Sequence, residues 1–193
     1  MTDPVTILGE YRDAVEGTAV TESTVHLKSD DLFQNWRRVS LSADFIARYY
    51  SYFFPYKEKA QEILDRESAE NSISFVLNEL IENTAKYSDA GKKEVEITIW
   101  MLGTFVLFNI SNFVKEELAG SFLKVAREIL DSDPEELYIK KLEKNIEETT
   151  GGSGLGYLTL INDFGVALGF RLEKMGQDLV KVTVQAKMKY KEA

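Results

Sequence analysis

The sequence predicts an α+β fold, a two-layer α/β sandwich in which helices cover one face of a mostly antiparallel sheet. Three observations predict it: stretches with helical periodicity lead the chain, stretches with period two come in pairs joined by short turns, and helical stretches return between the pairs. At 193 residues the chain fits one domain, 1–193, and can bury a full core without metals or disulfides. It contains no Cys, which excludes thiolate sites and cysteine nucleophiles.

Apolar spacing predicts the elements of the first half. Residues 5–17 are expected to form a short helix, and residues 23–41 to be rich in strand. Ser42 can cap a helix that Pro55 ends or kinks. A longer helix is expected over 69–87.

The second half alternates between hairpins and helices. Residues 95–101 and 106–110 alternate apolar and polar positions around a glycine turn, which predicts a β-hairpin. Two charged amphipathic helices should follow over 115–131 and 134–148, and then a glycine-rich loop that opens a short helix. A second hairpin is expected over 166–190.

The charge of the chain limits the classes of partner that we expect. The formal net charge is −9 and no basic stripe is present, so a nucleic-acid partner is not expected. No apolar run approaches transmembrane length, and the first residues lack a signal-peptide pattern, so we expect no membrane partner and a cytoplasmic protein.

Glu79 and Asn83 lie one helical turn apart on the flank of the apolar stripe of helix 69–87. An Asn oxygen suits Mg²⁺, and a Glu can accept a proton from an attacking hydroxyl or water. Lys86 would lie near phosphate or pair with Glu82. The alternative is that these residues form a solvated helix edge.

The loop at residues 151–156 holds four of the twelve glycines. Glycine lets the backbone approach a ligand, and the helix from Leu155 onward would direct free N–H groups at an anion. No Walker sequence follows, and no strand precedes the loop as a dinucleotide fingerprint requires. A plain connection between two helices is the alternative.

Taken together, these segments make the chain resemble the gyrase–Hsp90–histidine-kinase–MutL (GHKL) ATPase superfamily. Residues 79–88 resemble its N box, and residues 152–156 resemble its second glycine box. The resemblance implies the Bergerat-type ATP-binding fold, with ATP and Mg²⁺ as cofactors and residues 115–150 as a helical lid. It implies that Asn83 ligates Mg²⁺, that Glu79 is the base-like carboxylate, and that the phosphate side is lined by Gly152, Gly154, Leu155 and Gly156.

One position departs from the superfamily. The strand after the N-box helix should carry an Asp that binds the adenine amine, followed by Gly-x-Gly, but the matching residue is Asn112, followed by Phe and Val. An Asn oxygen can still accept a hydrogen bond from the amine, without the charge. Thr183 matches the adenine-side Thr of the last strand.

Within the superfamily, the chain resembles the stand-alone anti-sigma-type serine kinases and the SiaB-like protein kinases. A sensor kinase needs a phosphoacceptor His on a two-helix element, whereas the single His here, His26, is expected to be structural. The resemblance implies a Mg-ATP-dependent Ser/Thr protein kinase of bacterial partner switching, acting on a small STAS-like regulatory protein.

Two other functions stay open from the sequence. One is a binding or scaffold module, with or without nucleotide, which would hold its partner on helix 42–54 or on the lid helices. The other is an ATPase of the same fold that works through dimerisation. A homodimer therefore remains among the expected partners.

Overall fold

The chain folds around a six-stranded sheet in which every neighbouring pair is antiparallel, in the order β1-β5-β6-β4-β3-β2. The strands are β1 (Val5–Gly9), β2 (Thr21–Lys28), β3 (Glu94–Met101), β4 (Phe105–Lys115), β5 (Ala167–Lys174) and β6 (Leu179–Lys189). The structure is a computed structural model that describes residues 5–13, 17, 19–28, 36–54, 62–87, 94–148, 154–176 and 178–190, with backbone alone at 36–39, 62–64, 85–87 and 145–148.

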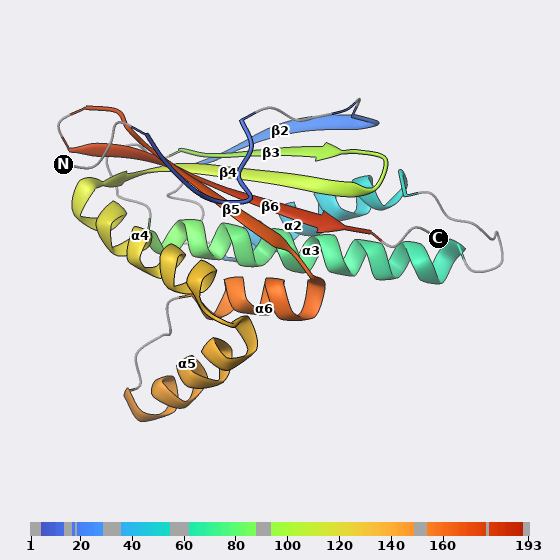
Figure 1. Cartoon of the computed structure of the whole chain (residues 1–193). Helices are drawn as coiled ribbons and strands as arrows, with labels where there is room; N and C mark the ends of the chain where they lie inside the picture. The colour runs from blue at the N-terminus through green and yellow to red at the C-terminus, as the bar shows by residue number, and fades with distance from the viewer. Residues whose placement is uncertain are drawn as a thin grey trace.

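Helices lie on one side of this sheet, as Figure 1 shows. They are α2 (Trp36–Ser51), α3 (Glu62–Tyr87), α4 (Glu116–Asp131), α5 (Pro134–Glu148) and α6 (Leu155–Phe164). The core forms where alternate strand residues meet the helices, and its largest fully buried side chains include Tyr50, Leu77, Ile97, Phe108, Tyr157 and Phe170. The expected α+β two-layer sandwich is therefore confirmed. No described helix has the length and apolar character needed to cross a membrane.

The first expected helix, 5–17, is wrong. Residues 5–9 form β1, which pairs with β5 at the sheet edge. Val5, Thr6 and Ile7 are β-branched, and this preference for strand outweighed a short helical pattern. Gly9 then turns the chain at φ 66°, in the left-handed region.

Two helices begin earlier than the sequence predicts. Residues 36–41 were expected to be strand-rich, but they belong to α2, which starts at Trp36. α3 starts at Glu62, before the expected 69, and its first described side chains, such as Asp65 and Glu67, are exposed. The run Asp65-Arg66-Glu67 contains no apolar residue, so periodicity could not extend the expected helix back from 69.

β1 and β2 follow each other in sequence but lie at opposite edges of the sheet, and we call the described residues that directly follow β1, residues 10–13, the strap. Arg12 receives a hydrogen bond on its carbonyl from Gln185 Nε2 (3.1 Å) and donates its N–H to Gln185 Oε1 (3.0 Å). Gln185 also donates to Asn109 Oδ1 (3.0 Å) and is 3% exposed. The strap thus covers part of the sheet face that the helices leave open.

Tyr50 joins α2 to the sheet from within the core. Its side chain is fully buried, and its hydroxyl donates to the carbonyl oxygen of Ile99 on β3 at 2.8 Å. Burial raises the pKa of Tyr50, because the phenolate would be formed away from water. The native state therefore holds this proton more tightly than the unfolded chain does.

We predict that Tyr50→Phe lowers the free energy of unfolding by about 1 kcal/mol at neutral pH, because one buried hydrogen bond is lost. In the wild type, both states keep the proton below about pH 10, and above it the unfolded chain ionises first, so stability falls as pH rises. The Phe variant should lose less stability over that alkaline range.

Urea unfolding at neutral and alkaline pH measures both effects. Tyr52→Phe is the matched control, because Tyr52 is 59% exposed. Equal alkaline slopes for Tyr50→Phe and wild type would contradict the assigned role.

Candidate nucleotide site

Glu79 and Asn83 lie on the face of α3 that meets α6. Asn83 is 2% exposed, and its Nδ2 donates to the main-chain oxygen of Glu79 at 2.8 Å. This bond orients the carboxamide along its own helix, so the side-chain oxygen Oδ1 is the atom that would meet a cation. The structure thus gives the predicted carboxamide a defined orientation.

Gly156 lies directly against these two side chains. A β-carbon at this position would overlap Glu79 Oε2 and lie 2.9 Å from Asn83 Nδ2. Only glycine lets the first turn of α6 come this close to α3. The two segments that are separated by about seventy residues in the sequence are therefore in contact.

Gly154 is the N-cap of α6, with φ 98° and ψ −3° in the left-handed region. It makes no side-chain cap hydrogen bond, and the first helical bond runs from Leu158 N to Gly154 O (3.2 Å). The N–H groups of Leu155 and Gly156 precede that bond, so they have no partner within the helix. Such a turn can bind an anion, assisted by the helix dipole.

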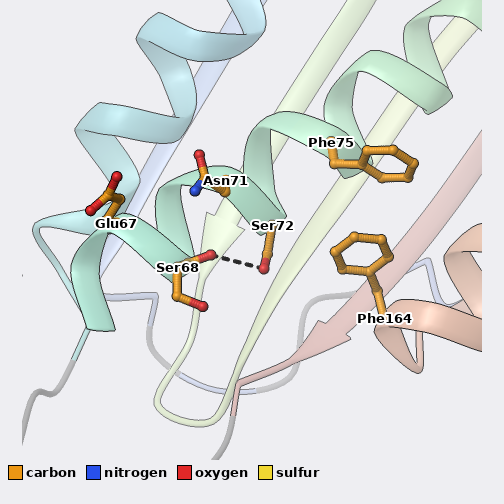
Figure 2. Close-up of a pocket in the computed structure, with 6 residues that line it drawn as sticks. All are labelled: Glu67, Ser68, Asn71, Ser72, Phe75 and Phe164. Atoms are coloured by element: carbon orange, nitrogen blue, oxygen red, sulfur yellow. Dashed lines mark hydrogen bonds between the residues drawn. The ribbon is translucent and has the colours of Figure 1, made fainter. Parts of the chain in front are cut away.

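The other end of α6 is also held against α3. Phe164 stacks on Phe75, with ring centroids 4.9 Å apart and planes 19° apart, so α6 runs antiparallel to α3. Figure 2 shows this pair beside an open groove of about 470 Å³. The groove is otherwise lined by Glu67, Ser68, Asn71 and Ser72 of α3. Contacts at both ends position the N-terminus of α6 next to Asn83.

Asn112 lies on the helix-facing side of β4, close to the end of α3. It is 4% exposed, and its Nδ2 donates to the main-chain oxygen of Thr84 at 3.3 Å. An aspartate could not make this bond, because an ionised carboxylate has no donor. The departure from the superfamily pattern therefore has a structural counterpart, a tie between β4 and α3.

Thr183 does not join this group. It pairs in register with Ser111, and the two hydroxyls are 3.0 Å apart. Since Ser111 precedes Asn112 on the strand, it faces the opposite side of the sheet, and so does Thr183. Thr183 belongs to the face near the strap, which Gln185 also occupies. The expected adenine-side position for Thr183 disagrees with this placement.

Two other expected site residues lie outside what the structure describes. Gly152 falls in the undescribed range 149–153, and Lys86 is described by its backbone alone.

The first half of the expected lid forms part of the helix layer. α4 buries Ala119, Phe122, Ala126 and Ile129, and Phe122 meets Phe170 edge to face at 5.6 Å. A β-carbon at Gly154 would contact Val125 and Ile129 of α4 at 3.2–3.4 Å. α5 lies against α6, where Asn162 Nδ2 donates to the carbonyl of Pro134 (3.3 Å). α4 therefore supports the glycine segment from one side.

The described residues fit a magnesium-bound nucleotide. They contain no cluster of three His, Asp or Glu side chains that could cage a metal ion. Mg²⁺ commonly takes one or two protein oxygens and completes its shell with phosphate oxygens and water. The Asn83 side chain lies against the first turn of α6 at Gly156, where no Cβ intervenes, and its oxygen Oδ1 is of the kind that suits that arrangement.

Sequence reasoning missed Thr84 and the pairing of Phe75 with Phe164. Thr84 contributes a main-chain oxygen, which every residue type has, so the sequence could not indicate it. The two phenylalanines look like ordinary apolar positions in the sequence. The sequence indicates Gly156 as a ligand-binding glycine but does not indicate its contact with α3.

Comparison with known proteins supports the architecture. No protein-family model matches the chain, and no curated protein does. A chain of the crystal structure of the SiaB–SiaC complex from Pseudomonas aeruginosa has a similar fold, with a TM-score of 0.57 and 14% sequence identity. The match covers 79% of this chain and 85% of that chain. At this identity the likeness concerns the fold alone.

We predict that Gly156→Ala lowers the free energy of unfolding by about 1–2 kcal/mol, because its methyl displaces the Glu79 carboxylate. In a Glu79→Ala background the same change should cost at least about 0.5 kcal/mol less, since the overlapping group is gone. A double-mutant cycle by urea unfolding measures this coupling.

Gly120→Ala provides the control. Gly120 is an exposed position within α4 and has open space around it, so alanine there should raise stability by about 0.5–1 kcal/mol. Additive effects at 79 and 156 would count against the contact.

Proposed function

We propose that this protein is a Mg-ATP-dependent Ser/Thr protein kinase that acts on a small STAS-like regulatory protein in partner-switching signalling. The observation that carries the proposal is the contact of Glu79 and Asn83 with the first turn of α6 across Gly156. This contact joins a carboxylate, a carboxamide and free helix N-terminal amides in one place, which is the set that phosphoryl transfer needs.

Each residue has a distinct role in this proposal. The N–H groups of Leu155 and Gly156 would bind phosphate oxygens, and Gly154 gives the chain the left-handed turn that exposes them. Asn83 Oδ1 would hold Mg²⁺, which supplies charge neutralisation to the phosphates. Glu79 would accept the proton of the acceptor Ser or Thr hydroxyl. Lys86, at the end of the same helix, would add positive charge near the phosphates.

Support for a protein substrate comes from the fold comparison. The similar structure is that of a complex between two proteins, SiaB and SiaC. In this proposal, a small regulatory partner presents a hydroxyl to Glu79.

Asn112 favours a second candidate, a binding module of the same fold that has lost base recognition. Its amide is engaged by the Thr84 carbonyl, and it lacks the charge of the superfamily Asp. In this alternative the helices hold a partner, with or without nucleotide, and no phosphate is transferred.

We predict that Asn83→Ala removes Mg-dependent ATP binding and lowers phosphorylation of the partner by about a hundredfold or more, because the metal-binding oxygen is lost. Calorimetric titration with Mg-ATP and transfer of labelled phosphate measure the two effects.

Asn78→Ala is the matched control for this test. Asn78 is another amide of α3, and its Nδ2 donates to Ser74 Oγ (3.3 Å) one turn away. This variant should bind and transfer as the wild type does. Full phosphorylation by Asn83→Ala would refute the assignment of Asn83 as the magnesium ligand, and nucleotide binding by the wild type without transfer would favour the binding module.

We predict opposite effects of Asn112→Asp on stability and on nucleotide selectivity. Stability should fall by about 1–3 kcal/mol, because the Thr84 carbonyl loses its donor. If residue 112 accepts from the adenine amine, a charged acceptor strengthens that bond and raises the preference for ATP over GTP, whose base presents an acceptor there.

Thermal unfolding and paired titrations with Mg-ATP and Mg-GTP separate these effects. A loss of stability with unchanged selectivity would indicate that residue 112 serves the fold alone.

A further inference from the structure

α2 carries a stripe of large apolar side chains on its outer face. We call Leu41, Phe45, Tyr49 and Tyr52 the α2 stripe; they are 67%, 76%, 46% and 59% exposed. Leu41, Phe45 and Tyr49 follow each other at intervals of four residues on α2, and Tyr52 lies in the turn directly after it. The helical residues of the stripe lie opposite the buried Ala43, Ile46, Ala47 and Tyr50. Such a continuous exposed patch marks an interaction surface.

The α2 stripe adjoins an open sheet edge. Tyr49 Oη lies 3.5 Å from Thr21 Oγ1 at the start of β2, and the neighbouring Tyr50 reaches Ile99 on β3. β2 is eight residues long, pairs with β3 on one side, and ends the sheet on the other side among the described strands. A long edge strand presents unpaired backbone N–H and C=O groups to another strand.

The side chains of β2 are complementary to those of a second β2. Antiparallel pairing about a two-fold axis at Val25 places Glu22 opposite Lys28 of the second copy, and Lys28 opposite Glu22. Thr24 then faces His26, and the two Val25 residues meet. A shift of one residue would set opposite sheet faces against each other, which excludes the adjacent registers.

The faces of β2 agree with this register. Val25 pairs with the buried Ile97 on the helix side of the sheet, whereas Thr24 bonds Thr98 across the outer side (3.2 Å). The Glu22–Lys28 pairs would therefore form on the outer face, and the Val25 pair would continue the apolar layer toward the α2 stripe.

We propose that this face, the β2 edge together with the α2 stripe, binds a second copy of the chain to form a two-fold dimer with one continuous sheet. The two copies of α2 would then pack side by side beneath the joined edges, because α2 lies under the β2–β3 edge. This inference does not depend on the proposed function.

The area supports a second copy. Large apolar side chains bury about 150–250 Å² each, so the exposed fractions of the stripe amount to roughly 800–1,200 Å² over two copies. The paired strands add further buried area. The total buried area then reaches the low end of the range for stable interfaces, which is about 1,200 Å². The two-fold axis places each Glu22 opposite a Lys28, and this charge complementarity favours a second copy of the chain over an unrelated protein.

Sedimentation velocity of the full chain across micromolar concentrations tests the proposal. The wild type should sediment as a dimer. Glu22→Lys and Lys28→Glu should each raise the dimer dissociation constant about tenfold or more, because each sets like charges across the new strand pair. Mixing these two variants should restore dimers, since every Lys then faces a Glu.

A second pair of variants tests the α2 stripe. Phe45→Ser should raise the dissociation constant at least about tenfold. Ile139→Ser is its matched control, because Ile139 is 57% exposed on α5, away from this face, and should leave the dimer unchanged. Circular dichroism melts show that each variant is folded.

A wild type that stays monomeric overturns the proposal. So does a dimer that survives both single charge reversals, or one that the mixture fails to restore. Restoration by mixing cannot come from a misfolded variant, so the test holds even where one variant loses stability.

Discussion

The contact of α6 with α3 at Gly156 is the constraint on which the site depends. A Cβ there would collide with Glu79 and crowd Asn83, so the glycine is required by helix packing before any ligand is considered. The same contact brings the open N–H groups of α6 beside the Asn83 carboxamide. Phe75 and Phe164 hold the far end of α6, and Val125 and Ile129 of α4 support its start. Donors held in place in this way need no rearrangement to meet developing charge, which is the arrangement that makes electrostatic catalysis effective.

The order of strands explains why the site lies on one face only. β1 and β2 sit at opposite edges, and the strap that follows β1 lies on the outer face, where Gln185 hydrogen-bonds the Arg12 backbone. On that face Ser111 and Thr183 are also hydrogen-bonded to each other. The helix-facing side remains for α3, α4 and α6. Strand alternation thus separates Asn112 from Thr183, although they are near neighbours across two paired strands.

Periodicity in the sequence predicted the hairpins, α4 and α5. The sequence also suggested that the Glu79–Asn83 segment and the glycine segment lie together, which the contact at Gly156 agrees with. It failed where tertiary pairing decided the outcome. Residues 5–9 have a helical apolar spacing, but their β-branched residues and their pairing with β5 make them a strand. The polar run Asp65-Arg66-Glu67 near the start of α3 offered no apolar stripe. Contacts such as Gly156 with Glu79, or Asn112 with the Thr84 carbonyl, join residues distant in sequence, and one of them uses a main-chain atom that no residue type reveals.

Asn112 has a role in the fold that is separate from the base contact proposed for it. Its Nδ2 ties β4 to the last turns of α3, the same helix that carries Asn83. An aspartate would place a charge against the Thr84 carbonyl, and two acceptors would then face each other in a buried place, at a cost in stability. The amide avoids this cost and retains an oxygen that can accept from a nucleobase amine. Compared with an Asp at this position, Asn112 lacks a negative charge that could face a nucleobase, but it gains an N–H group that donates to α3. Under the proposed nucleotide function, this exchange would weaken base recognition without abolishing it, and it would leave the proposed phosphate side, built on Gly154 and Gly156, unchanged.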